Sequence, residues 1–421
     1  MQMKKYKLGD IATVEISGVD KKITDGEKEI RLCNFVDVYY NWAITIVQHD
    51  SFMLATARPN EISKFQLKNG QVALTKDSET RYDIGIPTYI ADDFEDVILG
   101  YHCALISPNR DILDGRYLNA LLHTDYAKKY FACNASGSGQ RYALSVEALN
   151  SFPVPIIPLH EQKQIGKIFS ALDKKIELNR RINQNLEAMA KQLYDYWFVQ
   201  FDFPNEEGKP YKSSGGNMVW NEKLKRNIPI GWNNGTLIDI ANITMGQSPD
   251  STSYNEIGEG VLFYQGSTDF GMRFPSVRQY TTAPSRFAKK GDILMSVRAP
   301  VGTVNIANND CCIGRGLSAL NSKIGSTTHL YYILNDLRIA FDQRNAAGTT
   351  FGSITKEDLY SLPIVIPAKE VISAFDKICS PMFDRQMLLG EEIDTLIKQR
   401  DELLLLLLNG QVLVNSDLSL D

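Results

Sequence analysis

The sequence predicts an α+β protein in which two related domains are each followed by a long helix. Two observations carry this prediction: an internal repeat with a period of roughly 210 residues, and two long stretches with the spacing of coiled-coil helices. A chain of 421 residues also exceeds one ordinary domain. We therefore expect two duplicated α/β domains, held apart by a pair of long antiparallel helices and related by a pseudo-two-fold axis.

The internal repeat consists of two matching pairs of segments. Leu8–Ala12 (LGDIA) pairs with Leu237–Ala241 (LIDIA), and Leu144–Pro158 pairs with Ile354–Pro367. In both halves the second segment ends in a strand-like run with prolines, which leads into a long helical pattern. Because the period is the length of a whole domain, it indicates a duplicated domain and not a solenoid.

Short β-type runs alternate with turns and short helical stretches in each half, which is typical of a twisted mixed sheet with helices beside it. The predicted organisation is a first domain at 1–158, a central helix at 159–200, a linker at 201–231, a second domain at 232–367 and a C-terminal helix at 368–410. The linker is rich in Pro, Gly, Asn, Lys and Ser.

Apolar residues in both helical stretches recur at steps of three and four, the spacing that packs one helix against another. The predicted core of the helix pair consists of Leu172, Ile182, Leu186, Met189, Leu193, Leu389, Ile393, Leu396 and Leu403. Pro381 and Gly390 predict a kink or a frayed turn near the start of the second helix. The alternatives to an intramolecular pair are a coiled coil between two chains and packing on the domains.

The charge balance gives no basic footprint over the whole chain. The net charge is −5, with 17 basic against 20 acidic residues in 1–150 and 14 against 12 in 217–361. A nucleic-acid partner would therefore be bound by local patches. The sequence has no apolar run of membrane-spanning length, no signal peptide and no Cys-x-x-Cys pair among its six cysteines, which predicts a cytoplasmic protein with free thiols and no membrane partner.

Several motifs in the second half resemble the target-recognition domain of type I restriction-modification specificity subunits. They are Gly246–Pro249 (GQSP), Tyr264–Gly266 (YQG), Asp292–Gly302 (DILMSVRAPVG) and Cys312–Gly316 (CIGRG). Pro363–Pro367, with its twin before His160–Gln162, and Tyr194–Phe198 are similar to segments that border the conserved helices of that family. The resemblance covers nearly the whole chain, although the first domain keeps only Ala55–Pro59 (ATARP) of the longest motif.

The resemblance implies a DNA-recognition subunit that is not itself an enzyme. Each domain would bind one half of an interrupted double-stranded DNA site, and the helices would set the spacing and dock two methyltransferase subunits. Those partners would carry S-adenosylmethionine, and in a full restriction complex endonuclease subunits would add ATP and Mg²⁺. No cofactor or metal is expected on this chain, whose sequence has no Asn-Pro-Pro-Tyr motif, no phosphate loop and no zinc-spaced cluster.

Candidate DNA contacts follow from side-chain chemistry, since Arg pairs with guanine and Asn or Gln with adenine in the major groove. In the second domain they are Gln247, Ser248, Tyr264, Gln265, Arg273, Arg298, Arg315 and Thr350. In the first domain they are Arg58, Asn60, Lys64, Arg81, Tyr82, Gln140, Arg141 and Tyr142. The alternatives are an internal ion pair for Arg298 and Arg315, a turn-stabilising role for Gln247 and a core position for Tyr264.

Two other classes of function stay open at this point. A self-sufficient, bipartite DNA-binding regulator would use the same two domains without methyltransferase partners. A coiled-coil scaffold would have no DNA role, although the arginines and polar loops that recur in both domains argue against it.

Overall fold

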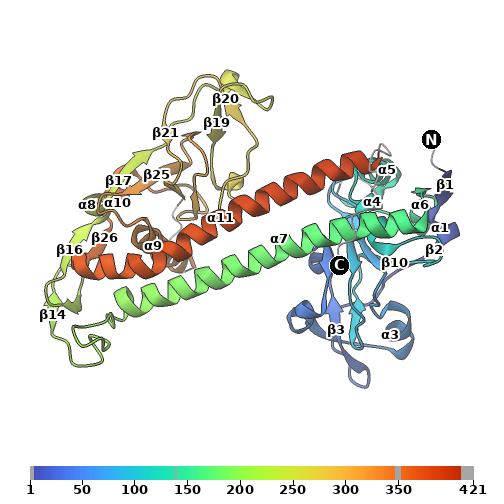
Figure 1. Cartoon of the computed structure of the whole chain (residues 1–421), viewed down its shortest axis with the longest axis horizontal. Coiled ribbons are helices and arrows are strands. Elements are labelled where there is room, and N and C mark those ends of the chain that lie inside the picture. The colour runs from blue at the N-terminus through green and yellow to red at the C-terminus, as the bar shows by residue number, and fades with distance from the viewer. Residues whose placement is uncertain (1–3, 138–139, 347–351, 409–421) are drawn as a thin grey trace. The chain divides into compact units, whose positions relative to one another are not determined.

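The computed structural model describes residues 4–137, 140–346 and 352–408, and the chain divides into two compact units. The first unit contains residues 1–178 and 394–421, and the second contains the residues between them. Sheets and helices occur in both units, and each of the two long helices contributes residues to both (Figure 1). The predicted α+β class is confirmed, whereas the predicted separation of the domains stays a prediction.

The first unit consists of one large sheet, two small sheets and a two-stranded ribbon. The large sheet has the order β2 (Ala12–Ile16), β10 (Cys103–Pro108), β6 (Val72–Thr75), β8 (Pro87–Ile90) and β4 (Ala43–Ile44). One small sheet has the order β5 (Met53–Ala57), β3 (Lys28–Cys33) and β9 (Val97–Leu99). The other has the order β11 (Ser136–Gly137), β12 (Tyr142–Ala143) and β7 (Asp77–Ser78). The ribbon pairs β1 (Lys4–Lys7) with β13 (Pro153–Ile156). The helices are α1 (Leu8–Ile11), α2 (Phe35–Tyr40), α3 (Pro59–Phe65), α4 (Gly115–Leu122), α5 (Asp125–Asn134) and α6 (Val146–Asn150).

The second unit also combines larger sheets with two-stranded ribbons, but its sheets differ from those of the first unit in strand number and order. One sheet has the order β17 (Ala241–Met245), β25 (Leu317–Ser322), β22 (Ile293–Ser296) and β23 (Val304–Ile306). The other has the order β18 (Tyr254–Asn255), β20 (Tyr280–Thr281), β19 (Val261–Tyr264), β24 (Cys311–Ile313) and β21 (Phe287–Ala288). Two ribbons pair β16 (Asn233–Thr236) with β26 (Pro363–Ile366) and β14 (Met218–Asn221) with β15 (Arg226–Pro229). The helices are α8 (Leu237–Ile240), α9 (Thr327–Ala346) and α10 (Lys356–Tyr360).

The equivalent ribbons confirm the internal repeat at the level of strand register. In the first unit Lys4 pairs with Ile156 and Lys7 with Pro153, and in the second Asn233 pairs with Ile366 and Thr236 with Pro363. Each ribbon leads into a one-turn helix, α1 or α8, and each proline-rich strand leads into a long helix. The two halves are thus the same supersecondary unit used twice.

The large sheets show which strands correspond, and they correct one motif assignment. In each unit the central strand, β10 or β25, is flanked by β2 and β6 or by β17 and β22. The strand that matches β22 is therefore β6, whereas Ala55–Ala57 belongs to β5 in another sheet. The expected match of Ala55–Pro59 to the longest motif is wrong. The true counterparts, β6 (VALT) and β22 (ILMS), are both buried but have no identical residue at equivalent positions.

Two long helices, α7 (Leu159–Tyr194) and α11 (Lys369–Leu408), pair in an antiparallel direction within the second unit. The ring of Phe375 lies 5.0 Å from that of Phe198, just beyond the end of α7, whereas the side-chain amide of Gln386 donates to the carbonyl oxygen of Asn183 at 3.2 Å. The contacted residue moves back along α7 as the chain advances along α11. The intramolecular pairing is therefore confirmed for this unit.

The seam between the helices differs in part from the predicted one. Leu389 and Ile393 are buried, and the other predicted leucines and Ile182 are half-buried. The Met189 residue is 53 % exposed, so its assignment to the core is wrong. The buried stripe of α7 includes Ile176, Asn179 and Asn183. A search for apolar heptads missed this stripe because two of its members are amides, which coiled coils use to fix register.

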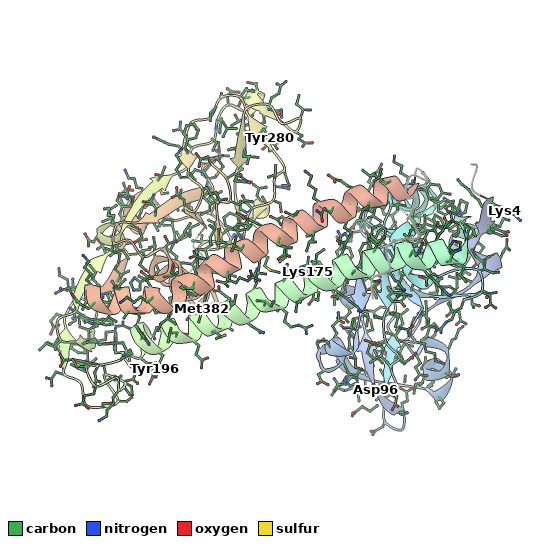
Figure 2. The ribbon with its side chains drawn as sticks, in the orientation of Figure 1. Lys4, Asp96, Lys175, Tyr196, Tyr280 and Met382 are labelled. Atoms are coloured by element: carbon green, nitrogen blue, oxygen red, sulfur yellow. The ribbon has the colours of Figure 1, made fainter. Side chains whose placement is uncertain are left out.

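Pro381 lies inside α11, which stays helical from Lys369 to Leu408. Figure 2 shows a bend in α11 close to Met382, in agreement with the kink predicted at this proline. Gly390 does not end or fray the helix. A methyl group there would meet the Phe274 ring at 2.6 Å, so this glycine allows a close approach between the helix and the second domain.

The predicted linker at 201–231 carries more structure than its composition suggests. It contains the β14–β15 hairpin, and the buried rings of Phe201 and Phe203 pack on Trp232 at centroid distances of 5.5 and 5.1 Å. The motif Tyr194–Phe198 ends α7 with buried Trp197 and Phe198 in the same aromatic core. None of the helices in the described part of the chain is both long and apolar enough to cross a membrane.

His329 is held neutral in the second unit, and this predicts acid sensitivity. Its side chain is 1 % exposed, and burial lowers the pKa of His329 to about 3. The unfolded imidazole titrates near pH 6.5, so below that pH the unfolded chain binds more protons and the free energy of unfolding falls, by on the order of 2 kcal/mol at about pH 5. His329→Phe should flatten the dependence of Tm on pH in this window, whereas His160→Phe, on an exposed part of α7, should leave it unchanged. An unaltered slope for His329→Phe would contradict this account.

Candidate nucleic-acid interface

Three loops of the second unit meet at one edge of its sheets. They are the segment after β17 (Gly246–Ser248), the segment after β19 (Gln265–Gly266) and the β24–β25 connection (Gly314–Gly316). The backbone amide of Gln247 donates to Ile313, and that of Gly314 donates to Tyr264, at 3.0 and 2.8 Å. These bonds fix the three loops against one another.

Glycines make this loop cluster possible because backbone meets backbone there. A Cβ on Gly246 would lie 2.2 Å from the carbonyl oxygen of Gly314, and one on Gly316 would lie 2.5 Å from the carbonyl oxygen of Gln265. Real Cβ atoms do not approach a carbonyl oxygen this closely, so a side chain would push the loops apart. These close approaches explain why Gly246 of the GQSP motif and Gly316 of the CIGRG motif are glycines.

Five predicted contacts of the second domain converge on this edge. Gln247, Gln265 and Arg315 are exposed, and the Ser248 hydroxyl oxygen accepts the Arg315 backbone amide at 3.2 Å. Arg298 follows Val297, whose amide donates to Gly316 at 2.9 Å, so it belongs to the same edge. Within the described ranges, the guanidinium groups of Arg298 and Arg315 have no hydrogen-bond or ion-pair partner. The alternative of an internal ion pair is therefore not supported for either residue.

Arg286 is a member of this edge that the sequence analysis missed. It is exposed, and its carbonyl oxygen accepts the amide of Ile313 at 2.9 Å, while the neighbouring Ser285 hydroxyl donates to the carbonyl oxygen of Gln247 at 2.6 Å. The available signal was the local cluster of Arg286, Lys289 and Lys290 just before and after β21. Lys289 is paired with Asp310 at 2.7 Å, so the cluster does not act as one patch.

Two predicted contacts of the second domain are corrected by their burial. Tyr264 is 0 % exposed and belongs to the small core beneath the loop cluster, where β19 runs parallel to β24. Arg273 is 8 % exposed, which leaves no surface for a DNA base. Thr350 lies outside the described residues.

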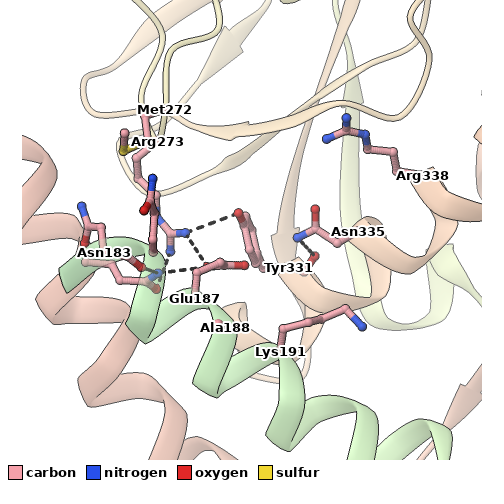
Figure 3. Close-up of a pocket in the computed structure, with 11 residues that line it drawn as sticks. Asn183, Glu187, Ala188, Lys191, Met272, Arg273, Tyr331, Asn335 and Arg338 are labelled. Carbon is pink, nitrogen blue, oxygen red and sulfur yellow. Dashed lines mark hydrogen bonds and ion pairs between the residues drawn. The ribbon is translucent and has the colours of Figure 1, made fainter. Parts of the chain in front are cut away.

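Arg273 is instead the centre of a polar network in the second unit (Figure 3). Its guanidinium donates to Glu187 of α7 at 3.1 Å, to Gln386 of α11 at 3.2 Å and to the Tyr331 hydroxyl of α9 at 3.3 Å. The group also lies 4.5 Å from the centroid of the Phe383 ring. This network forms one wall of a cleft of about 600 Å³ between α7 and α9.

The first unit has an equivalent loop edge, which its backbone hydrogen bonds identify. Gly100 donates to Cys33 at 2.8 Å, as Gly314 does to Tyr264 in the second unit. Lys76 donates to His102 at 2.9 Å, as Val297 does to Gly316. Asp77 is therefore the residue that corresponds to Arg298, and Tyr101 corresponds to Arg315.

Polar and aromatic side chains surround the edge of the first unit. The carboxylate of Asp77 accepts from Lys76 at 2.9 Å and from Nδ1 of His102, and Arg141 donates to Nε2 of the His102 ring at 3.0 Å. Burial alone would raise the pKa of Asp77, but these donors hold it below its ordinary value. Arg81 lies over the Tyr142 ring at 5.1 Å.

The predicted contacts of the first domain thus fall into two groups. Arg81, Tyr82, Gln140, Arg141 and Tyr142 belong to the loops at or beside this edge. Arg58, Asn60 and Lys64 lie at α3 instead, where Arg58 is 3.5 Å from Glu27 and Lys64 is 3.1 Å from Glu15. Among the residues that the structure describes, no group of three acidic, histidine or cysteine side chains could hold a metal ion.

The duplicated fold and its two exposed loop edges define a protein with two recognition domains. The family model described as the type I restriction modification DNA specificity domain matches residues 2–188 and 229–384. A chain of Methanocaldococcus jannaschii assigned as the type I restriction enzyme MjaX specificity subunit is 31% identical over 370 residues, which cover 85% of this chain and 82% of that one. The type I restriction enzyme HindI specificity subunit of Haemophilus influenzae is 24% identical over 416 residues, which cover 83% and 88%. The crystal structure of a type I restriction-modification S subunit from M. genitalium shares the fold, with a TM-score of 0.58, 15% identity and coverage of 96% and 95%.

This chain belongs to the type I restriction modification specificity family, and it contains two DNA specificity domains. The resemblance that the loop motifs indicated is confirmed. The matched regions end inside α7 and inside α11, so each includes one domain and part of the helix that follows it.

Proposed function

We propose that this chain selects the target of a type I restriction-modification complex, with each domain binding one half of an interrupted DNA site. The observation that carries the proposal is the convergence of Gln247, Gln265, Arg298 and Arg315 on one exposed loop edge of the second domain. Forked amide and guanidinium groups form two hydrogen bonds with the edges of adenine and guanine. The first domain presents an equivalent edge for the other half-site.

Catalysis belongs to partner subunits in this proposal. Two methyltransferase subunits dock on the helix pair and carry S-adenosylmethionine, and they flip the target adenine from the stack. Endonuclease subunits with ATP and Mg²⁺ join the complex for cleavage. The chain works in the cytoplasm, where host DNA and these partners are present, and the helix pair sets the distance between the half-sites.

The test is co-expression with the methyltransferase subunit of the same system, followed by mapping of N6-methyladenine in host DNA. We expect methylation at one bipartite motif, which disappears when this chain is deleted. A self-sufficient regulator would instead bind its site with full affinity alone and leave adenine methylation unchanged, and that result would contradict the proposal.

Arg315→Ala should weaken binding of the assembled complex to its own motif. Loss of a bidentate contact with a base costs about 1–3 kcal/mol, which is roughly a 5- to 150-fold loss of affinity. Loss of a phosphate contact lowers the salt slope, the steepness with which log affinity falls with log salt concentration, by about 1. Duplex titrations at several salt concentrations measure both quantities. Lys323→Ala is the control, because the Lys323 ammonium already donates to the carbonyl oxygen of Ile238. Equal affinities for Arg315→Ala and the unaltered complex would remove Arg315 from the interface.

A further inference from the structure

The two recognition domains differ in charge at equivalent positions of their loop edges. Asp77 stands where the second domain has Arg298, and Tyr101 stands where it has Arg315. The side chain of Asp77 is only 9 % exposed, and it neutralises the cations around it: Lys76 at 2.9 Å and Arg141 at 3.8 Å. The loop edge of the second domain therefore carries positive charge at these two positions, whereas the edge of the first domain carries a carboxylate that offsets the neighbouring cations.

Two other predicted cations of the first domain, Arg58 and Lys64, are also paired with acids. Arg58 lies 3.5 Å from Glu27 and 3.7 Å from Glu61, and Lys64 lies 3.1 Å from Glu15. Arg81 has an aromatic partner, Tyr142, at 5.1 Å. By contrast, Arg286, Arg298 and Arg315 have no acidic partner within the described parts of the second domain. Among its predicted contact residues, the first domain therefore has few cations without an acidic neighbour to meet DNA phosphates.

Exposed aromatic side chains take the place of the cations on the first domain. Tyr82 is 87 % exposed, Tyr40 75 % and Tyr101 37 %, and Val36 beside them on α2 is 55 % exposed. The helix α2 occupies the chain position of the single turn Ser267–Asp269 in the second domain, since each follows the strand that pairs in parallel with β9 or β24.

The segments that carry Tyr40 and Tyr82 are linked to each other by a side-chain hydrogen bond. The Tyr39 hydroxyl donates to the Asp83 carboxylate at 2.8 Å and so ties α2 to the loop that carries Tyr82. The rings of Tyr39 and Tyr40 pack edge to face at 4.8 Å. Arg81 in the same loop stacks on Tyr142 of β12. Large, preorganised tyrosines supply contact area at low entropic cost and keep a hydroxyl for a hydrogen bond.

We infer that the two domains bind their half-sites by different chemistry. The first domain contacts its half of the duplex mainly through Tyr40, Tyr82 and Tyr101, which meet bases and sugars. The second domain uses Arg286, Arg298 and Arg315, which neutralise phosphates and pair with guanine. The inference rests on the proposed function, because it names the residues with which that function distinguishes the two half-sites.

The consequence is an asymmetric response to salt. Each phosphate that a cation neutralises adds about 0.9 to the slope of log affinity against log salt, whereas aromatic contacts add nothing to that slope. Contacts between aromatic side chains and bases are worth about 1–3 kcal/mol each. Removal of tyrosines from the first domain should therefore reduce affinity at every salt concentration by the same factor.

The experiment uses the assembled complex with its methyltransferase subunits and duplexes that carry the methylated motif. The double variant Tyr40→Ala/Tyr82→Ala should bind at least about 10-fold more weakly with an unchanged salt slope, and it should lose discrimination only in the half-site of the first domain. Tyr82→Phe should retain most of the affinity, since it keeps the ring. Arg315→Ala is the opposite case, with a slope lower by about 1.

Three results would overturn the inference. The double variant would bind as tightly as the unaltered complex, or its salt slope would fall as it does for Arg315→Ala, or it would fail to assemble with the methyltransferase while keeping its own Tm. The last result would make the tyrosines a protein-docking surface. Failure of the proposed function is distinct, because the unaltered complex would then show no preference for any motif.

Discussion

Arg273→Ala is expected to lower the free energy of unfolding by about 2–3 kcal/mol. Removing one partner of a fully buried ion pair costs about 3–5 kcal/mol, and the expected loss is smaller here because the Glu187 side chain is 34 % exposed. The guanidinium is 8 % exposed and joins Glu187 of α7, Gln386 of α11 and Tyr331 of α9. Its loss leaves the side-chain oxygen of the buried Gln386 without its donor and removes a cation from the faces of two aromatic rings.

Chemical denaturation of the full chain measures this effect. Lys289→Ala is the matched control, because its ion pair with Asp310 is exposed to solvent at both ends and should contribute little to stability. Arg273→Met, which keeps the length and removes the charge, should restore little, since Glu187 loses its cationic partner and the Gln386 side-chain oxygen loses its donor. A loss below about 1 kcal/mol for Arg273→Ala would mean that this network does not hold the second domain to the helices.

Gly246→Ala is expected to abolish selective binding to the half-site of the second domain. The new Cβ would lie 2.2 Å from the carbonyl oxygen of Gly314 and 2.8 Å from that of Leu317, and backbone atoms cannot move aside as a flexible side chain can. Displacement of the loops misplaces Gln247 and Arg315 together. If each contact is worth about 1–3 kcal/mol, the combined loss of affinity is on the order of 100-fold or more.

Gly266→Ala is the control for this variant. It lies in the neighbouring loop, has an extended backbone, and has no atom within 4 Å of an added Cβ. We expect methylation by the assembled complex to persist for Gly266→Ala and to disappear for Gly246→Ala, with both variants still assembled. Unchanged methylation for Gly246→Ala would mean that the loop cluster is not the interface.

The repeat, the long helices and the loop cluster of the second domain could be predicted because each leaves a local pattern. Proline-rich strands, heptads and glycine motifs depend on neighbours within a few residues. Met189 shows the limit of this information: its heptad spacing fits the seam, but the inner stripe of α7 runs through Asn179 and Asn183.

The role of Arg273 and the equivalence of Asp77 with Arg298 depend on distant partners. Arg273 meets residues 86 and 113 positions away, and an arginine suited to DNA is equally suited to a buried clamp. Asp77 and Arg298 share neither letter nor charge, and only backbone hydrogen bonds to the following loop reveal their common place. The binding edge of the first domain was therefore found only in part.

The end of α11 belongs to the first unit, and this affects the order in which the protein can fold. Leu404 packs in the same core as Ile165 and Phe169, and the Arg400 guanidinium lies 4.8 Å from the Trp42 ring. The ribosome makes these partners hundreds of residues apart, so the domain that is synthesised first waits for nearly the last turns of the chain before its core is closed. Until then, Trp42 has His123 and Phe169 as ring partners, at 3.9 and 5.9 Å, and this core lacks Leu404.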